Sequence, residues 1–253
     1  YLDHLIISPV FDNLDYVEVL MVGVQKSVVD TYLNLMKEID IFPVCFEPES
    51  MAISRALIEK EITTEPVLIL DLGAKNTKFI IFAGTSIRFS STLPIGSFHF
   101  TEAIAKNLNL SFQEAERLKV EKGLGEKLNL KLEEGGKKIR KKRDDIFECL
   151  IPTLVDLVQQ IRKYLDYYQF HANHFYLTAN KKPISKIILS GGGAQLKGIE
   201  QFLMAELGYK IEKGNPLSNV SIDPEIKNTE ENFLPFVTVV GLALRINKEK
   251  FYD

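Results

Sequence analysis

The chain has 253 residues, of which 45% are hydrophobic and 26% are charged, a composition typical of a folded globular protein. Its 34 acidic residues outnumber its 31 basic ones, and this balance argues against nucleic acid as the main partner. No apolar run reaches the roughly 20 residues that a membrane-spanning helix needs. The two cysteines, Cys45 and Cys149, have no second thiol or histidine at zinc-ligand spacing. Because the chain opens with Tyr1 instead of methionine, we expect an N-terminal portion to be absent.

The first 65 residues predict a strand, a helix, a strand and a second helix. Residues 16–22 have strand composition, residues 27–39 carry apolar side chains at helical spacing, and residues 42–46 return to strand composition. Residues 49–59 follow Pro48, a common helix start signal, and repeat the helical spacing. We expect this last helix to lead into a new domain.

Three strands and two helices are predicted next. After Pro66, three short apolar runs at residues 67–72, 77–83 and 86–93 are separated by turn residues, which predicts an antiparallel meander. Polar helical stretches follow at residues 97–107 and 111–122. Residues 123–143 are rich in glycine, lysine and glutamate and predict a surface segment.

The last third contains the clearest helix, over residues 144–170, with Pro152 placed to kink it. A short buried strand at residues 184–189 then leads through consecutive glycines to a helix over residues 196–207, which ends at Gly208. Residues 233–247 predict a closing helix. The order of strand, glycine turn and helix is typical of a nucleotide site.

The first candidate site is an aspartate at the end of a buried strand, followed by a glycine turn into the next strand. Asp71 could hold a hydrated magnesium ion or orient a water, and the turn's backbone N–H groups could bind an anion. The motif alone favours ordinary turn chemistry. Its residues are Asp71, Leu72, Gly73, Ala74, Lys75, Asn76 and Thr77.

The second candidate is the triple-glycine turn Gly191, Gly192 and Gly193. Three consecutive glycines are costly to order, so they mark a close approach of another backbone or of a ligand. A tight structural turn explains them equally well. The pattern is not a P-loop, because no Gly-Lys-Ser/Thr follows, and it lacks dinucleotide-fingerprint spacing.

The third candidate is the pair Glu116 and Lys119, three residues apart on one face of a predicted helix. The simpler interpretation of this spacing is a surface ion pair, worth about 0–1 kcal/mol.

Together, and in this order, the three motifs resemble the actin-like ATPase superfamily, and within it the FtsA-like PilM family of type IV pilus assembly. The resemblance runs through nearly the whole chain and covers roughly the last two thirds of a PilM-type protein. Other residues that carry it are Phe46-Glu47-Pro48-Glu49, Phe100 to Ala105, Asn215-Pro216 and Gly241 to Arg245.

The resemblance implies ATP and Mg²⁺ in a cleft between two lobes. Asp71 would be the catalytic residue and would hold Mg²⁺ through water, while Glu116 and Lys119 would face the ribose. The family's first phosphate hairpin would precede Tyr1, and hydrolysis, if any, would be slow. The remaining implied nucleotide contacts are Gly73, Ala74, Lys75, Asn76 and Thr77 at the phosphates, and Gly191, Gly192, Gly193, Gln195 and Lys197 at the adenosine.

The implied fold is α/β and actin-like, of the ribonuclease H type, with one near-complete lobe. Residues 66–219 would form this second lobe, with residues 101–180 as its helical subdomain. Residues 1–46 would be part of an FtsA-type small subdomain, residues 47–65 the linking helix of the first lobe, and residues 220–253 a closing loop and helix that return to the first lobe.

The implied function is that of a cytoplasmic scaffold, attached to the inner membrane through a PilN-like protein whose N-terminal peptide it docks. Residues 16–22 and 27–39 would border part of the docking groove, although core packing explains them as well. Self-association is a further expectation. The alternatives are an FtsA-like cell-division filament and membrane tether, a small-molecule kinase of the same superfamily, and a scaffold that has lost nucleotide binding.

Overall fold

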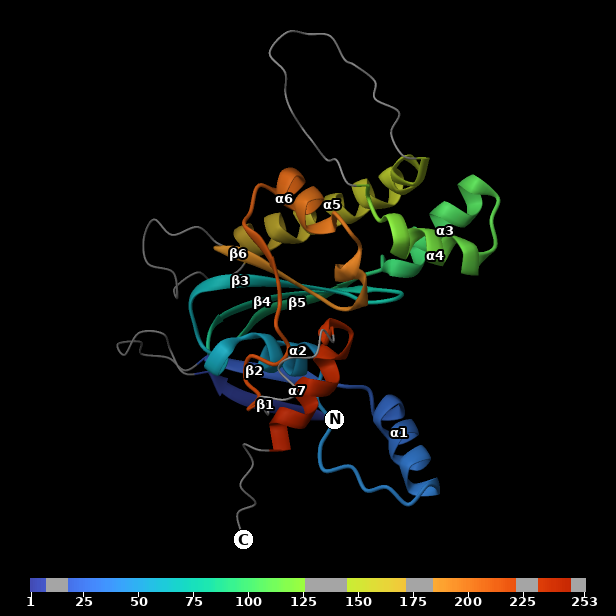
Figure 1. Cartoon of the computed structure of the whole chain (residues 1–253). Helices are drawn as coiled ribbons and strands as arrows, with labels where there is room; N and C mark the ends of the chain where they lie inside the picture. The colour runs from blue at the N-terminus through green and yellow to red at the C-terminus, as the bar shows by residue number, and fades with distance from the viewer. Residues whose placement is uncertain (8–17, 126–144, 172–183, 222–231, 247–253) are drawn as a thin grey trace.

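The computed structural model describes residues 1–7, 18–125, 145–171, 184–221 and 232–246. A five-stranded sheet with helices on both faces forms the body, and a small N-terminal unit lies at one side (Figure 1). Most of the predicted surface segment 123–143, part of the predicted closing loop, and Tyr16 and Val17 of the first predicted strand lie outside the described residues.

The central sheet contains the predicted meander. Its strands are β3 (Thr63–Leu72), β4 (Thr77–Gly84), β5 (Ser86–Leu93), β6 (Lys186–Ser190) and β7 (Ile211–Lys213), in the order β5-β4-β3-β6-β7. The β3/β4 and β4/β5 pairs are antiparallel, while β3/β6 and β6/β7 are parallel. The β3 and β6 strands therefore end at the same edge of the sheet.

Alternation along β3 divides the core between the two faces of the sheet. Leu68, Leu70 and Leu72 belong to a core that also contains residues of α3 (Ser97–Leu108), α5 (Asp145–His171) and α6 (Ile199–Leu207). Val67 and Ile69 belong to the opposite core, under α2 (Glu49–Leu57) and α7 (Val237–Ile246). Figure 1 shows these helices above and below the sheet, with α4 (Phe112–Lys122) beside α3 at one end. The predicted long helix is confirmed as α5.

Helices α2 and α7 approach each other closely because residue 241 is a glycine. A Cβ atom on Gly241 would lie 1.9 Å from the carbonyl oxygen of Ala52. Beside this crossing, Glu47 accepts hydrogen bonds from Arg55 of α2 at 2.6 and 2.8 Å and from Arg245 of α7 at 2.7 Å. The connector before α2 is thus fixed to both helices.

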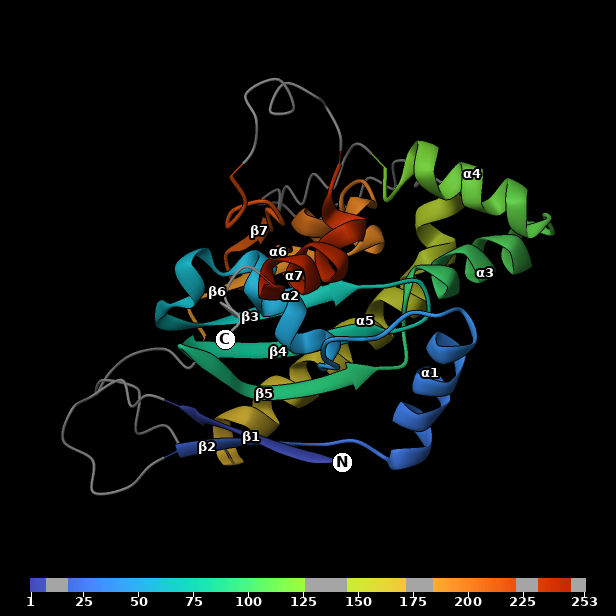
Figure 2. The same ribbon diagram turned by 90° about the horizontal axis from the view of Figure 1, so that it is seen from below.

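The N-terminal unit contains the antiparallel strands β1 (Leu2–Ile7) and β2 (Glu18–Gly23) and the helix α1 (Lys26–Glu38). It lies beside the β5 edge of the main sheet (Figure 2), and an ion pair between Arg88 and Glu18 joins the two. Helix α1 has no buried residue.

In this part of the chain one sequence prediction is wrong and one strand was not predicted. Residues 42–46 are not a strand: they have neither helical nor strand structure, and Phe42 and Val44 are 79% and 70% exposed. The prediction was based on their apolar side chains, but none of the described strands pairs with these residues. The strand β1 was not predicted, because its apolar residues do not alternate regularly.

The helix after the glycines also begins later than predicted. Residues Gly192–Gln195 form a separate 3₁₀ turn, and α6 starts at Ile199 instead of Leu196. Gly198, with φ of +85°, separates the two elements, because this left-handed conformation interrupts a helix. The N-terminus of α6 therefore does not follow directly from the glycine turn.

Candidate functional site

The site lies where β3 and β6 end side by side. Asp71 on β3 and Ser190 on β6 are register partners across the parallel pair. Gly191 follows with φ of +81°, and a Cβ atom there would lie 2.5 Å from the carbonyl oxygen of Leu72 and 2.9 Å from Asp71 Oδ1. Only glycine allows the turn to pack this closely on the Asp71 strand.

Asp71 is half-buried, and one of its carboxylate oxygens is buried with unused hydrogen-bonding capacity. Asp71 Oδ1 and Ser190 Oγ are both buried without a hydrogen-bond partner among the described residues. Burial raises the pKa of Asp71 to about 6, against the opposing effect of the neighbouring Ser190 hydroxyl. A carboxylate of this kind can accept a water or a hydrated cation.

The hairpin between β3 and β4 is anchored to the start of α3. The carbonyl oxygens of Gly73 and Ala74 accept hydrogen bonds from the N–H groups of Ser97 and Phe98 at 2.9 and 2.8 Å. Gly96 makes this contact possible, since a Cβ atom there would lie 2.5 Å from the Ala74 carbonyl oxygen. The hairpin is therefore held in a fixed position relative to Asp71.

The tip of the hairpin has free donors. Ala74, Lys75 and Asn76 are exposed, and within the described part of the chain their N–H groups donate no hydrogen bond. The Gly73 N–H instead donates to the Asn76 carbonyl oxygen at 3.0 Å. The hydroxyl of the buried Thr77 donates to the Ile95 carbonyl oxygen at 2.6 Å. The predicted phosphate contacts thus divide into three free amides and two residues that hold the hairpin together.

Lys119 is a buried residue, so the surface ion-pair interpretation is wrong for it. It is 4% exposed, and its ammonium contacts Ser97 Oγ at 2.7 Å, Thr101 Oγ1 at 2.9 Å and Glu116 Oε2 at 2.8 Å. Although partial burial opposes the shift, Lys119 and Thr101 hold the pKa of Glu116 below its usual range. Ser97 therefore links Lys119 to the hairpin, and Glu116 is held as a carboxylate.

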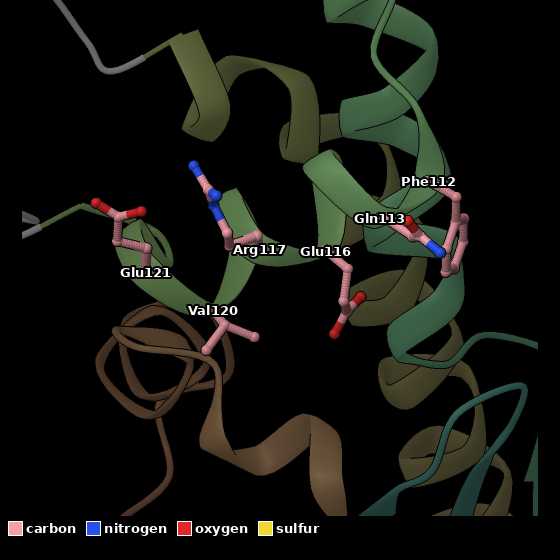
Figure 3. Close-up of a pocket in the computed structure, with 6 residues that line it drawn as sticks. All are labelled: Phe112, Gln113, Glu116, Arg117, Val120 and Glu121. Atoms are coloured by element: carbon pink, nitrogen blue, oxygen red, sulfur yellow. The ribbon is translucent and has the colours of Figure 1, made fainter.

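An open groove of about 530 Å³ runs along α4, and we call it the α4 groove. Glu116 and Val120 point away from the helix on one side, toward the chain segment that follows β6 (Figure 3). Lys197 of that segment donates its ammonium to the Glu121 carbonyl oxygen at 2.6 Å. The groove is lined by Phe112, Gln113, Glu116, Arg117, Val120 and Glu121.

The three glycines of the turn differ in their surroundings. Gly191 and Gly193 pack on β3, where a Cβ atom on Gly193 would lie 2.9 Å from Leu72 Cβ. A Cβ atom on Gly192 would meet nothing within 4 Å, and Gly192 and Gln195 are exposed. Close packing explains Gly191 and Gly193, and Gly192 alone of the three is exposed.

The glycine turn contacts β3 directly, and α4 is linked to the hairpin through Lys119 and Ser97. Sequence reasoning missed Ser190, which directly follows the apolar residues of β6, and Ser97, which begins α3. Both could have been found as serines at a terminus of a predicted strand or helix: Ser190 immediately before the glycine turn, and Ser97 at the start of the helix after the meander. None of the helices in the described ranges is long and apolar enough to cross a membrane.

The sheet order and the helices on both faces define an α/β protein of the actin-like class, and solved structures agree. The chain is similar to a chain of a PilM-PilN type IV pilus biogenesis complex, with a TM-score of 0.71, 24% identity, and coverage of 97% of this chain and 66% of that one. MreB5 of Spiroplasma citri bound to AMPPNP gives a TM-score of 0.63, 19% identity, and coverage of 89% and 67%.

The model of the family described as type IV pilus assembly protein PilM matches residues 1–247, and the chain belongs to this family. A curated relative, the cell division protein FtsA of Helicobacter pylori strain J99, is 25% identical over 204 residues. That match covers 77% of this chain, which spans 40% of the relative's length. The FtsA of Bacillus subtilis strain 168 is 26% identical over 109 residues, covering 42% of this chain and 24% of the relative.

Proposed function

We propose that the chain is the nucleotide-binding part of a type IV pilus assembly scaffold, and that its ligand is ATP with Mg²⁺. The observation that carries the proposal is the buried, unsatisfied Oδ1 of Asp71 near the end of the strand that leads into a hairpin tip with three free amides. A carboxylate next to a row of backbone donors matches the needs of a metal-bound phosphate chain.

Each element of the site has a role in this proposal. Asp71 would hold the hydration shell of Mg²⁺, which when bound neutralises phosphate charge. No group of three or more His, Cys, Asp or Glu in the described ranges is arranged to hold a metal directly, so the residues fit a hydrated ion held through water. Ala74, Lys75 and Asn76 would donate their amides to phosphate oxygens, and Gly73 and Thr77 would hold the hairpin in shape.

The adenosine would lie between the glycine turn and the α4 groove. Glu116, kept ionised by Lys119, can accept hydrogen bonds from ribose hydroxyls. Gly192 would face the base, with Gln195 at its edge, while Gly191, Gly193 and Lys197 position the turn. In this assignment Lys119 acts through Glu116 and Ser97, because it is buried.

The scaffold role rests on family membership and on an exposed apolar stripe on α1. Val28, Tyr32, Leu35 and Ile39 are spaced for one helix face and are 46–59% exposed. We assign this stripe to part of the groove that receives the N-terminal peptide of a PilN-like inner-membrane protein. The protein would then lie in the cytoplasm, attached to the inner membrane through that partner.

The division of the chain follows from the same proposal. Residues 1–46 form the small subdomain, residues 47–65 contain the linking helix of the first lobe, residues 66–219 form the second lobe with residues 101–180 as its helical subdomain, and residues 220–253 return to the first lobe. The extensive contact between α2 and α7 supports placing the last segment with the linking helix.

Calorimetric titration of Mg·ATP into the 253-residue chain and into the complete gene product tests the nucleotide site. We expect Asp71→Ala to weaken Mg²⁺-dependent binding at least tenfold, because Asp71 supplies the unpartnered Oδ1 between the hairpin and Ser190. The matched control is Asp156→Ala, on the exposed side of α5. Equal binding by both variants would contradict the assignment.

Titration of a PilN-type N-terminal peptide tests the scaffold. Leu35→Ser should weaken peptide binding about tenfold without loss of stability, because Leu35 is 55% exposed. Lys37→Ser, also exposed on α1, is the control. Tight ATP binding without peptide binding would favour the FtsA-like filament or the small-molecule kinase, and binding of neither would leave a scaffold that has lost both ligands.

A further inference from the structure

Ser190 is a buried hydroxyl without a partner, next to a buried carboxylate oxygen without a partner. Ser190 is 0% exposed, and neither its Oγ nor Asp71 Oδ1 makes a hydrogen bond of normal geometry among the described residues. The two are register partners at the ends of adjacent parallel strands. Leaving such groups unsatisfied is costly, because each loses its hydrogen bonds to water on folding.

The glycine turn packs closely around this pair. Gly191 follows Ser190 at φ of +81°, and a Cβ atom there would lie 2.9 Å from Asp71 Oδ1. Any other residue at 191 would therefore crowd the carboxylate. Among the described residues, no side chain of the turn donates a hydrogen bond to Oδ1.

We propose that Ser190 is a positioning residue that, with Asp71, binds one water molecule between β3 and β6. This inference deepens the proposed function and rests on it in one respect: when nucleotide is bound, this water belongs to the hydration shell of the Mg²⁺ ion. A buried water needs two to four polar partners, and Asp71 Oδ1 and Ser190 Oγ supply two. The Ser190 hydroxyl fixes the side of the carboxylate from which the water is held.

The test compares Ser190→Ala with a matched substitution elsewhere in the protein. Ser54 on α2 is also buried, at 3% exposed, and its Oγ also has no hydrogen-bond partner among the described residues. It belongs to the opposite face of the sheet, so Ser54→Ala removes the same atom under the same burial without touching Asp71.

The first measurement is the affinity for ADP by calorimetry in excess MgCl₂ and in EDTA, on the complete gene product. Mg²⁺ should raise the affinity for ADP, and we expect this gain to be about tenfold smaller in Ser190→Ala than in the wild type. The affinity in EDTA should be the same in Ser190→Ala and the wild type. Ser54→Ala should change neither quantity. An unchanged Mg²⁺ gain in Ser190→Ala, or an equal loss with and without Mg²⁺, would overturn the assignment.

The second measurement does not depend on nucleotide binding. A high-resolution crystal structure of the nucleotide-free protein should show an ordered water within hydrogen-bond distance of Asp71 Oδ1 and Ser190 Oγ, absent in Ser190→Ala. If the wild-type protein binds no ADP, the proposed nucleotide site fails, and this water decides the inference by itself. A dry space between the two groups would overturn it.

Discussion

Asp71 reduces the stability of the folded chain at neutral pH. Burial raises its pKa from 3.8 to about 6, so the folded state holds the proton more tightly than the unfolded state. Below pH 3.8 Asp71 is protonated in both the folded and the unfolded state, so it does not change the free energy of unfolding. Between pH 3.8 and 6 only the unfolded state ionises, and stability falls until it levels off above pH 6.

Asp71→Asn should therefore stabilise the nucleotide-free protein above pH 7. A shift of this size corresponds to about 2–3 kcal/mol in the free energy of unfolding. Urea denaturation in EDTA measures it, and the advantage of the variant should disappear by about pH 4. A difference of the same size at both pH values would show that the effect does not come from the carboxylate charge.

Lys119 joins α3 to α4 through a buried ammonium. Lys119→Met keeps much of the apolar stem but leaves Ser97, Thr101 and Glu116 without their shared donor. Because Glu116 is 40% exposed and can be rehydrated, we expect a loss of about 2–3 kcal/mol, below the full cost of breaking a buried ion pair. Lys122→Met, exposed in the last turn of the same helix, should change the urea midpoint little. Equal losses in the two variants would contradict the network.

At the scale of elements, the crossing of α2 and α7 depends on a single missing side chain. A Cβ atom at residue 241 would lie 1.9 Å from the Ala52 carbonyl oxygen, and backbone cannot move aside as a side chain can. Gly241→Ala should therefore lower the thermal midpoint, with a loss of about 1–3 kcal/mol or more. Gly192→Ala, where a Cβ atom meets nothing within 4 Å, is the control and should leave the midpoint unchanged.

The elements that sequence predicted well are those whose apolar pattern is set by the central sheet. Strands β3 and β4 are buried on both faces, as their continuous apolar runs predict, and α5 buries the apolar face that its helical spacing predicts. The strand prediction for residues 42–46 failed because their apolar side chains are exposed, and composition alone does not show whether a side chain is buried. The predicted start of α6 was wrong because Gly198 adopts a left-handed conformation that interrupts the helix, and apolar spacing does not show backbone conformation.

At the candidate site, too, sequence reasoning found some residues and missed others. Asp71 and the glycine turn were candidates from their local residue patterns, and the structure brings them into contact. The partners Ser190 and Ser97 were missed, because a contact between strand ends or between a helix start and a hairpin is nonlocal. The helical spacing also favoured a surface position for Lys119. Spacing shows which face of the helix a side chain lies on, but it does not show whether neighbouring elements bury that face.

At the scale of the whole molecule, the small N-terminal unit is joined to the body through the connector at Glu47. The Glu47 side chain is 1% exposed and lies between Arg55 and Arg245, two residues from helices that lie next to each other in space but almost 200 positions apart in the chain. Although burial opposes the shift, the hydrogen bonds from Arg55 and Arg245 hold the pKa of Glu47 below its usual range. This carboxylate therefore stabilises the fold in its charged form.

Glu47→Gln should destabilise the protein by about 3 kcal/mol at neutral pH, because it leaves two guanidinium groups without their shared counter-charge. The sign of the pH dependence is opposite to that at Asp71: the contribution of Glu47 is complete above its unfolded pKa of 4.5 and is lost as pH falls through its lowered folded value. Urea midpoints of variant and wild type should therefore converge in acid. Glu49→Gln, whose partner Lys78 forms an exposed ion pair with it, should cost less than about 1 kcal/mol at every pH. If Glu47→Gln behaved like Glu49→Gln, the connector would be held by apolar contacts and not by this charge cluster.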